Sequence, residues 1–273
     1  MKVVFGHWKY IFKNLWFVLP FALVPAVFVA LSIDQGAIRE LAHEFFTGAP
    51  QVQFFLLFRA FSFVRVDHWL GAVYGVGAAV TTVIFTTVML SLVEKHMRIG
   101  KRTFSGAFSQ VGNFALTALL VVIVYLALYE LWALVLSAIL FVITALNHLL
   151  VVYILYGVAC ALLLIVLLYV TTIFYLWLPC MQITGFKPYD AFLYAYRLMI
   201  GVRWRLIGAM AISFLVGAAA IGAASFLPLY AFLPIAFVLS VFLLLSFCIR
   251  MEAVYFYTDK LDREDVIRSY REL

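Results

Sequence analysis

A chain of 273 residues in which 67% are hydrophobic and only 12% are charged lies far outside the composition of a soluble globular domain. Its length accommodates six membrane spans of about 20 residues each with short connections, and leaves no room for a separate soluble domain. The formal net charge of +6 would suggest nucleic acid in a soluble protein. Here the basic residues flank apolar runs, which indicates orientation in a membrane, and we expect no nucleic-acid partner.

The N-terminal segment, residues 1–14, has the pattern of an amphipathic helix that lies on the membrane surface. Apolar Trp8 and Phe12 recur on one helical face, and Lys9 lies toward the other. The apolar run that follows, residues 15–33, is long enough to cross the bilayer and is the first predicted span.

Residues 34–69 form the longest segment that we do not expect to cross the membrane. Its apolar part is short and is interrupted by Arg59. It therefore predicts a piece that lies on the membrane surface, a re-entrant piece, or a lid packed on the outer mouth of the bundle.

The second predicted span, residues 70–93, carries two patterns. Gly71 and Gly75 recur at a four-residue spacing, which is typical of a face for close helix packing. A polar stripe of threonines has two interpretations: the hydroxyls bond carbonyls of their own helix, or they line a pore. The stripe consists of Thr81, Thr82, Thr86 and Thr87.

A basic turn over residues 94–104 precedes the long apolar stretch 113–178. This stretch has space for two spans and an outer connection near residues 144–148. Pro179 ends or kinks the fourth span, since proline has no amide proton to donate.

The segment that follows, residues 185–205, predicts a turn and then a short amphipathic helix in the membrane surface. Gly185 and Pro188 mark the turn, and apolar positions recur at helical spacing from Tyr189 to Ile200. A basic–aromatic–basic cluster of the kind found at headgroup level closes the segment: Arg203, Trp204 and Arg205.

These residues carry a family resemblance. Over residues 191–216 the sequence resembles uncharacterised six-span bacterial membrane protein families, which are related to the membrane domain of glycerophosphoryl diester phosphodiesterases. The shared pattern comprises Leu198, Met199, Gly201, Arg203, Trp204, Arg205 and Leu206. The chain departs from it at Ala195, where serine is common, and at Ile200, where a basic residue is common. The resemblance implies a six-span fold and supplies no activity, because the soluble phosphodiesterase domain has no counterpart here.

The fifth and sixth spans are expected over residues 206–226 and up to Phe247, and a charged tail, residues 258–273, is expected to form a short helix. The fold class is therefore an all-α polytopic membrane protein built as a single domain. Similar turns after the second and fourth spans suggest three repeats, each an interfacial helix followed by a hairpin. Their approximate bounds are 1–94, 95–178 and 179–257.

Under this threading both termini are cytoplasmic and the protein lies in the cell membrane. Of the 19 Lys and Arg residues, only Arg39, Arg59 and Arg65 fall in segments expected on the outer side. Such a bias sets the orientation of membrane proteins.

The sequence contains no phosphate-cradling loop, zinc spacing or nucleophile elbow, so we expect no catalytic residues, metal site or cofactor. Cys160, Cys180 and Cys248 have the pattern of core residues. The candidate binding residues are Glu130, with Asn147 and His148 as possible partners in sequence, and the pair Arg203 and Arg205. Glu130 either reaches the outer interface beside an aromatic belt or forms a polar site at the outer mouth, covered by residues 34–69, for a headgroup or cation. Arg203 and Arg205 either anchor the chain or hold a lipid phosphate.

Two functions remain. The first, which the resemblance favours, is a protein that binds or moves a lipid or small hydrophobic molecule between its helix pairs. The alternative is a non-catalytic scaffold or auxiliary subunit, whose partner is another membrane protein or a second copy of the chain. We do not expect an enzyme, because no paired acid and base can be placed in the sequence.

Overall fold

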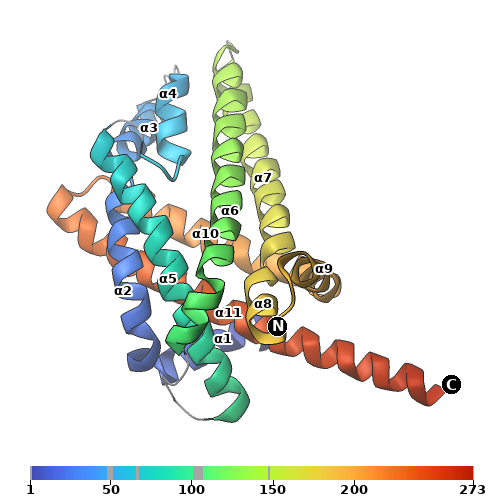
Figure 1. Cartoon of the computed structure of the whole chain (residues 1–273). Helices are drawn as coiled ribbons and strands as arrows, with labels where there is room; N and C mark the ends of the chain where they lie inside the picture. Colours follow the sequence, from blue (N-terminus) through green and yellow to red (C-terminus); the bar gives the residue numbers. More distant parts are fainter. Residues whose placement is uncertain (1, 48–51, 66–67, 101–106, 147, 273) are drawn as a thin grey trace.

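The computed structural model describes residues 2–47, 52–65, 68–100, 107–146 and 148–272, which form helices and no strand (Figure 1). In chain order these are α1 Lys2–Lys13, α2 Leu15–Ser32, α3 Gln35–Thr47, α4 Phe54–Phe61, α5 Trp69–Ile99, α6 Ala107–Thr144, α7 Leu149–Phe174, α8 Trp177–Thr184, α9 Pro188–Met199, α10 Arg203–Ala224 and α11 Leu229–Glu272.

Six of the described segments are long and apolar enough to cross a membrane: α2, α5, α6, α7 together with α8, α10 and α11. The prediction of an all-helical fold with six such segments is confirmed. Two predicted boundaries are wrong. The sixth apolar segment extends to Lys260, well beyond Phe247, and the expected separate tail helix is a continuation of α11. An uninterrupted helix forms because no Gly or Pro follows Pro234 in α11.

The six long helices form a closed ring. Each contacts the next in chain order, from α2 through α5, α6, α7 and α10 to α11, and α11 returns to contact α2. A further contact between α5 and α11 crosses the ring. We call the end of the bundle that holds α1, α9 and the last turns of α5 the terminal end. The distal end holds α3, α4 and the tip of the α6–α7 hairpin (Figure 1).

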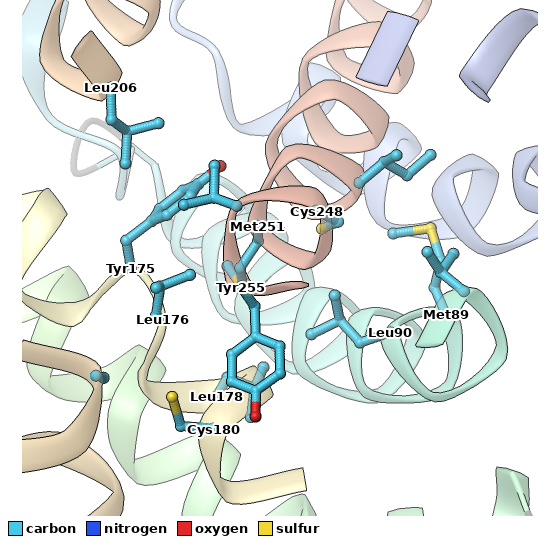
Figure 2. Packing of buried hydrophobic residues seen from close by; sticks show 14 of the residues in the cluster. Met89, Leu90, Tyr175, Leu176, Leu178, Cys180, Leu206, Cys248, Met251 and Tyr255 are labelled. Carbon is cyan, nitrogen blue, oxygen red and sulfur yellow. The ribbon is translucent and has the colours of Figure 1, made fainter. Parts of the chain in front are cut away.

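The apolar core is unevenly distributed between these two ends. One large cluster fills the terminal half and draws residues from α1, α2, α5 and every later helix, with Leu90, Leu176 and Met251 among its buried members (Figure 2). In the distal half, one cluster joins α3 and α4 to α6 and α7, and another joins α2 to α10 and α11. Among the described residues, α7 and α10 therefore share a core only toward the terminal end.

The α3–α4 segment is packed on the bundle and does not lie apart from it. Leu57 of α4 is fully buried in the cluster with α6 and α7, and α4 contacts α6 along its length. Of the three arrangements considered for residues 34–69, the structure favours a lid of two short helices at the distal end.

The small residues of α5 lie where another part of the chain packs closely against this helix. A Cβ atom on Gly71 would lie 2.6 Å from a side-chain atom of Arg65, and one on Gly75 would meet Val64. The connection from α4 thus runs directly against the first turns of α5. Two members of the threonine stripe bond their own helix, since Thr81 donates to the Gly77 carbonyl and Thr87 to that of Val83, whereas the Thr86 hydroxyl lies 3.8 Å from the Cys248 sulfur of α11.

The amphipathic helix expected at the N-terminus is α1, and its predicted apolar face packs on the protein only in part, through the partly buried Trp8. His7 and Ile11 are buried, whereas Phe12 is 64% exposed. The reason is that α1 packs against α11, where the His7 Nε2 lies 2.9 Å from the Ser246 hydroxyl. The face with Phe12 is then left for the surrounding lipid, as expected for a helix in the interface.

Gly100 and Gly185, the two turn glycines compared in the proposed repeat, adopt similar conformations. Both have positive φ, 74° and 69°, and each ends a helix with a left-handed residue, which glycine adopts without a steric penalty. However, α6 is one continuous helix of 38 residues, and the described residues show no separate interfacial helix between α5 and α6. The three-unit repeat therefore stays a prediction.

Candidate functional site

The first polar site lies at the terminal end, where α7, α9 and α10 meet. The turn from Ile200 to Val202 separates α9 from α10 and brings Arg203 to the first position of α10. Arg203 is only 8% exposed. Its guanidinium carbon lies 5.1 Å from the ring centroid of Tyr169 on α7 and 4.8 Å from that of Tyr196 on α9. Cation–π attraction to both rings therefore holds the guanidinium in one place.

The hydrogen bonds of this guanidinium are incomplete. Its Nη1 donates to the Tyr169 hydroxyl at 3.1 Å, while its Nε and Nη2 are buried without a partner among the described residues. Buried donors without acceptors are unusual and costly. The neighbouring Arg205 and Trp204 are exposed, and Trp204 is 70% exposed. The sequence treated the two arginines alike, but the structure makes Arg203 a held side chain and leaves Arg205 at the surface.

The second polar site is Glu130, near the middle of the apolar part of α6. Its Oε2 accepts a hydrogen bond from the Ser62 hydroxyl at 2.8 Å, and its Oε1 accepts from the amides of Phe63 and Val64, both at 2.9 Å. The adjacent Tyr129 hydroxyl donates to the Phe61 carbonyl. Glu130 thus lies beneath the segment 34–69, and its carboxylate fastens the end of α4 to α6.

His148 and Asn147 do not take part in this arrangement as far as the structure describes them. Asn147 lies outside the described residues. His148 precedes α7, beyond the end of α6 at Thr144, and about 20 Å of helix separates Glu130 from that end. None of the described hydrogen bonds joins His148 to Glu130.

A third polar site, at the start of the lid, was not singled out from the sequence. The Asp34 carboxylate, 3% exposed, accepts two hydrogen bonds from Arg59 at 2.7 and 3.0 Å and one from the amide of Ala37. The Asp34 side chain therefore caps the N-terminus of α3 and also links α3 to Arg59 of α4. The sequence does contain a signal for this site, because an aspartate that directly precedes a segment with helical periodicity of its apolar residues is typical of a helix N-cap.

The sequence also missed a group of buried polar residues in the terminal half. Arg250 and Glu252 of α11 are 3% and 0% exposed, and Glu94 of α5 is 7% exposed. Arg250 Nη2 donates to the Ser213 and Ser246 hydroxyls at 3.1 and 3.0 Å. These residues were expected in surface turns, because the predicted second and sixth spans end at Val93 and Phe247.

Comparisons with protein-family models, with curated proteins and with solved structures found no match to the chain. Six apolar helices of spanning length are consistent with a multi-pass membrane protein. Within the described part of the chain, no group of three or more His, Cys, Asp or Glu side chains is arranged to hold a metal ion. The site whose geometry points most directly to a ligand is the incompletely bonded Arg203.

Proposed function

We propose that the protein binds a phospholipid between α7 and α10, with Arg203 on the headgroup phosphate. The observation that supports this is the Arg203 guanidinium, which is positioned by two aromatic rings and keeps two N–H groups without acceptors. The planar fork of arginine matches the oxygens of a phosphate, and such charge-assisted hydrogen bonds are among the stronger ones in proteins.

The position of Arg203 suits a lipid headgroup. It begins an apolar helix that crosses the membrane, next to the exposed Trp204 and the amphipathic α9, so it lies at the level where headgroups are found. Because Nε and Nη2 are covered beside the tyrosine rings, a phosphate reaches them only when a ring moves. The Tyr196 side chain, which is 40% exposed, is the one we expect to rotate.

The acyl chains of such a lipid would lie on the distal side of this headgroup position. The α7 and α10 helices converge at Tyr169 and Arg203 but have no shared buried cluster toward the distal end. Apolar side chains on both distal halves are exposed: Val158 and Leu162 on α7, and Leu215 and Val216 on α10. A lipid tail placed there covers apolar surface on both helices, and the site opens laterally to the membrane.

The alternative, a scaffold or auxiliary subunit, draws on the same exposed apolar residues. These faces suit either lipid or a partner helix, so they do not separate the two functions. The partly bonded Arg203 favours the lipid, because a phosphate supplies the missing acceptors. We further propose that the terminal end faces the cytoplasm of a bacterial cell, that the lipid belongs to the inner leaflet, and that the protein is not an enzyme. The resemblance to six-span families belongs with these proposals.

The test compares Arg203→Gln with Arg205→Gln in the full chain. Each variant is purified in mild detergent with added anionic phospholipid, and the retained lipid is measured by native mass spectrometry. We expect Arg203→Gln to lower lipid retention about fivefold or more, since a basic contact near the membrane surface contributes about 1 kcal/mol and this one is partly buried. Arg205→Gln should stay close to the unsubstituted protein.

Two further variants separate binding from folding. Arg203→Lys keeps the charge but loses the planar fork, and Tyr196→Leu removes one of the two rings that hold the guanidinium. Both should give intermediate retention with an unchanged elution volume in size exclusion. Equal lipid retention by Arg203→Gln and the unsubstituted protein would refute the proposal and reduce Arg203 to an orientation signal.

A further inference from the structure

A second site, independent of the lipid site, begins with Glu252 in the middle of α11. The side chain is fully buried, and neither carboxylate oxygen has a hydrogen-bond partner among the described residues. Burying a carboxylate is costly unless a partner compensates its charge. Arg250, two residues away, does not compensate it, because residues i and i+2 on a helix do not face each other and because Arg250 Nη2 donates to Ser213 of α10 and Ser246 of α11.

The surroundings of Glu252 follow from the way α5 and α11 pack. Both helices run from the distal to the terminal end, and they touch where the Thr86 hydroxyl lies 3.8 Å from the Cys248 sulfur. One turn further along each helix, Glu252 comes opposite Leu90 of α5. Figure 2 shows Leu90 close to Cys248 and Tyr255, which precede and follow Glu252 on α11.

Two other oxygen atoms without partners lie on the helices next to this position, since Glu252 interacts electrostatically with Glu94 of α5 and with Cys180 of α8. The Ser91 hydroxyl on α5 and the Gln182 Oε1 on α8 are both buried without a hydrogen-bond partner among the described residues. The amide nitrogen of Gln182 donates to the Thr87 carbonyl at 3.2 Å, which places the Gln182 side chain one turn from Ser91. Together with the two carboxylate oxygens of Glu252 on α11, the hydroxyl on α5 and the amide oxygen on α8 make four oxygen atoms without a hydrogen-bond partner among the described residues.

No positive charge is paired with the Glu252 carboxylate among the described contacts. Glu94, one turn below Leu90 on α5, interacts electrostatically with Glu252, but its own carboxylate is paired with Arg98 Nε at 2.9 Å. The other titratable groups near this region include the Cys180, Cys248 and Tyr255 side chains and the Asp259 carboxylate, which accepts a hydrogen bond from the Tyr194 hydroxyl at 2.8 Å. None of these groups brings a positive charge. The buried carboxylate of Glu252 is therefore the charge that a ligand would neutralise.

We propose that Glu252, Ser91 and Gln182 form a buried site for a small monovalent cation, with sodium as the probe. Oxygen atoms are the ligands that hard cations prefer. A proton on Glu252 would also neutralise the charge, so the test below separates the response to sodium from the response to pH. A divalent ion would need more carboxylates than the single uncompensated one, and the described residues hold no group of three metal-binding side chains. Such a cation joins α5, α8 and α11 at the terminal end.

The test measures the thermal unfolding midpoint of the full chain in non-ionic detergent, with sodium chloride replaced by choline chloride at constant ionic strength. A ligand that binds only the folded state raises the midpoint as its concentration increases. We expect sodium to raise the midpoint of the unsubstituted protein. Glu252→Gln should lose this response and unfold in choline at or above the midpoint of the unsubstituted protein, because the neutral amide removes the buried charge.

Two serine variants complete the experiment. Ser91→Ala should need about tenfold more sodium for the same rise in midpoint, corresponding to the loss of one ligand. Ser137→Ala is the matched control, since Ser137 is also buried in a span but its hydroxyl donates to the Ala133 carbonyl of its own helix. An unchanged sodium response in Glu252→Gln, or a stability of the unsubstituted protein that varies with pH but not with sodium, would overturn the proposal. Lipid retention by Arg203 does not enter this measurement, so either proposal can fail alone.

Discussion

At the scale of single residues, the described charged side chains within the protein are placed by partners of different chemistry. Arg203 is held by aromatic rings, Glu130 by backbone amides, and Asp34 by Arg59 and an amide. In an apolar bundle each of these contacts is strengthened by the low dielectric and becomes costly when one partner is removed.

Removal of the Asp34 carboxylate tests this directly. Asp34→Ala deletes the acceptor of both Arg59 hydrogen bonds and of the Ala37 amide, so we expect it to lower the free energy of unfolding by about 1–3 kcal/mol. Asp34→Asn retains an oxygen for Ala37 and should cost less. The unfolding midpoint in detergent reports the difference. Glu40→Gln, at an exposed position of α3, is the control and should change nothing; an equal loss there would show that any charge change on α3 suffices.

Several of these residues could be found from the sequence and others could not. Arg203 and Glu130 stand out because each is a charge beside or within an apolar run, which is rare and therefore conspicuous. Glu252 and Arg250 were missed because two charges two residues apart suggest the end of a span, although the apolar residues, the helix and its packing continue beyond them to Lys260. His7 was hidden because the buried side of α1 is set by α11, a contact that no local pattern encodes.

At the scale of elements, the helices were predictable because spanning length is set by the bilayer and not by the rest of the fold. Gly and Pro marked the turns at Gly100 and Gly185 for the same local reason. The order of the helices around the ring was not predictable, since it depends on side-chain packing between helices distant in sequence. The placement of α4 on α6 is such a case, and Glu130 is the residue that fixes it.

Substitution of Glu130 should therefore release the end of α4 without unfolding the bundle. In Glu130→Ala the amides of Phe63 and Val64 lose their shared acceptor, and we expect their hydrogen exchange to become at least about tenfold faster. Glu130→Gln keeps one acceptor oxygen and should lie between. Mass spectrometry of peptides that cover residues 62–65 measures the exchange. Unchanged protection in Glu130→Ala would mean that packing of Leu57, rather than the carboxylate, holds the segment.

At the scale of the whole molecule, the ring has two unlike ends. The terminal end has a continuous core and carries most of the basic residues, while Arg39, Arg59 and Arg65 belong to the segment at the distal end. Arg250 is buried and does not contribute to the charge of the surface, but the asymmetry between the two ends is too large for one residue to reverse it. The positive-inside tendency therefore still predicts a cytoplasmic terminal end.

Cysteine labelling tests this orientation in intact bacterial cells. Thr47→Cys places an exposed thiol at the end of α3, and Lys187→Cys places one at the start of α9, near the opposite end of the bundle. A membrane-impermeant maleimide should modify Thr47→Cys before lysis and Lys187→Cys only after permeabilisation. The unsubstituted chain is the control, since Cys180 and Cys248 are buried and Cys160 is partly buried. A reporter fused after Leu273 should likewise be active only in the cytoplasm. Labelling of Lys187→Cys in intact cells would show that the bundle has the opposite orientation. Arg203 would then lie in the outer leaflet, and the proposed lipid would have to enter from that side.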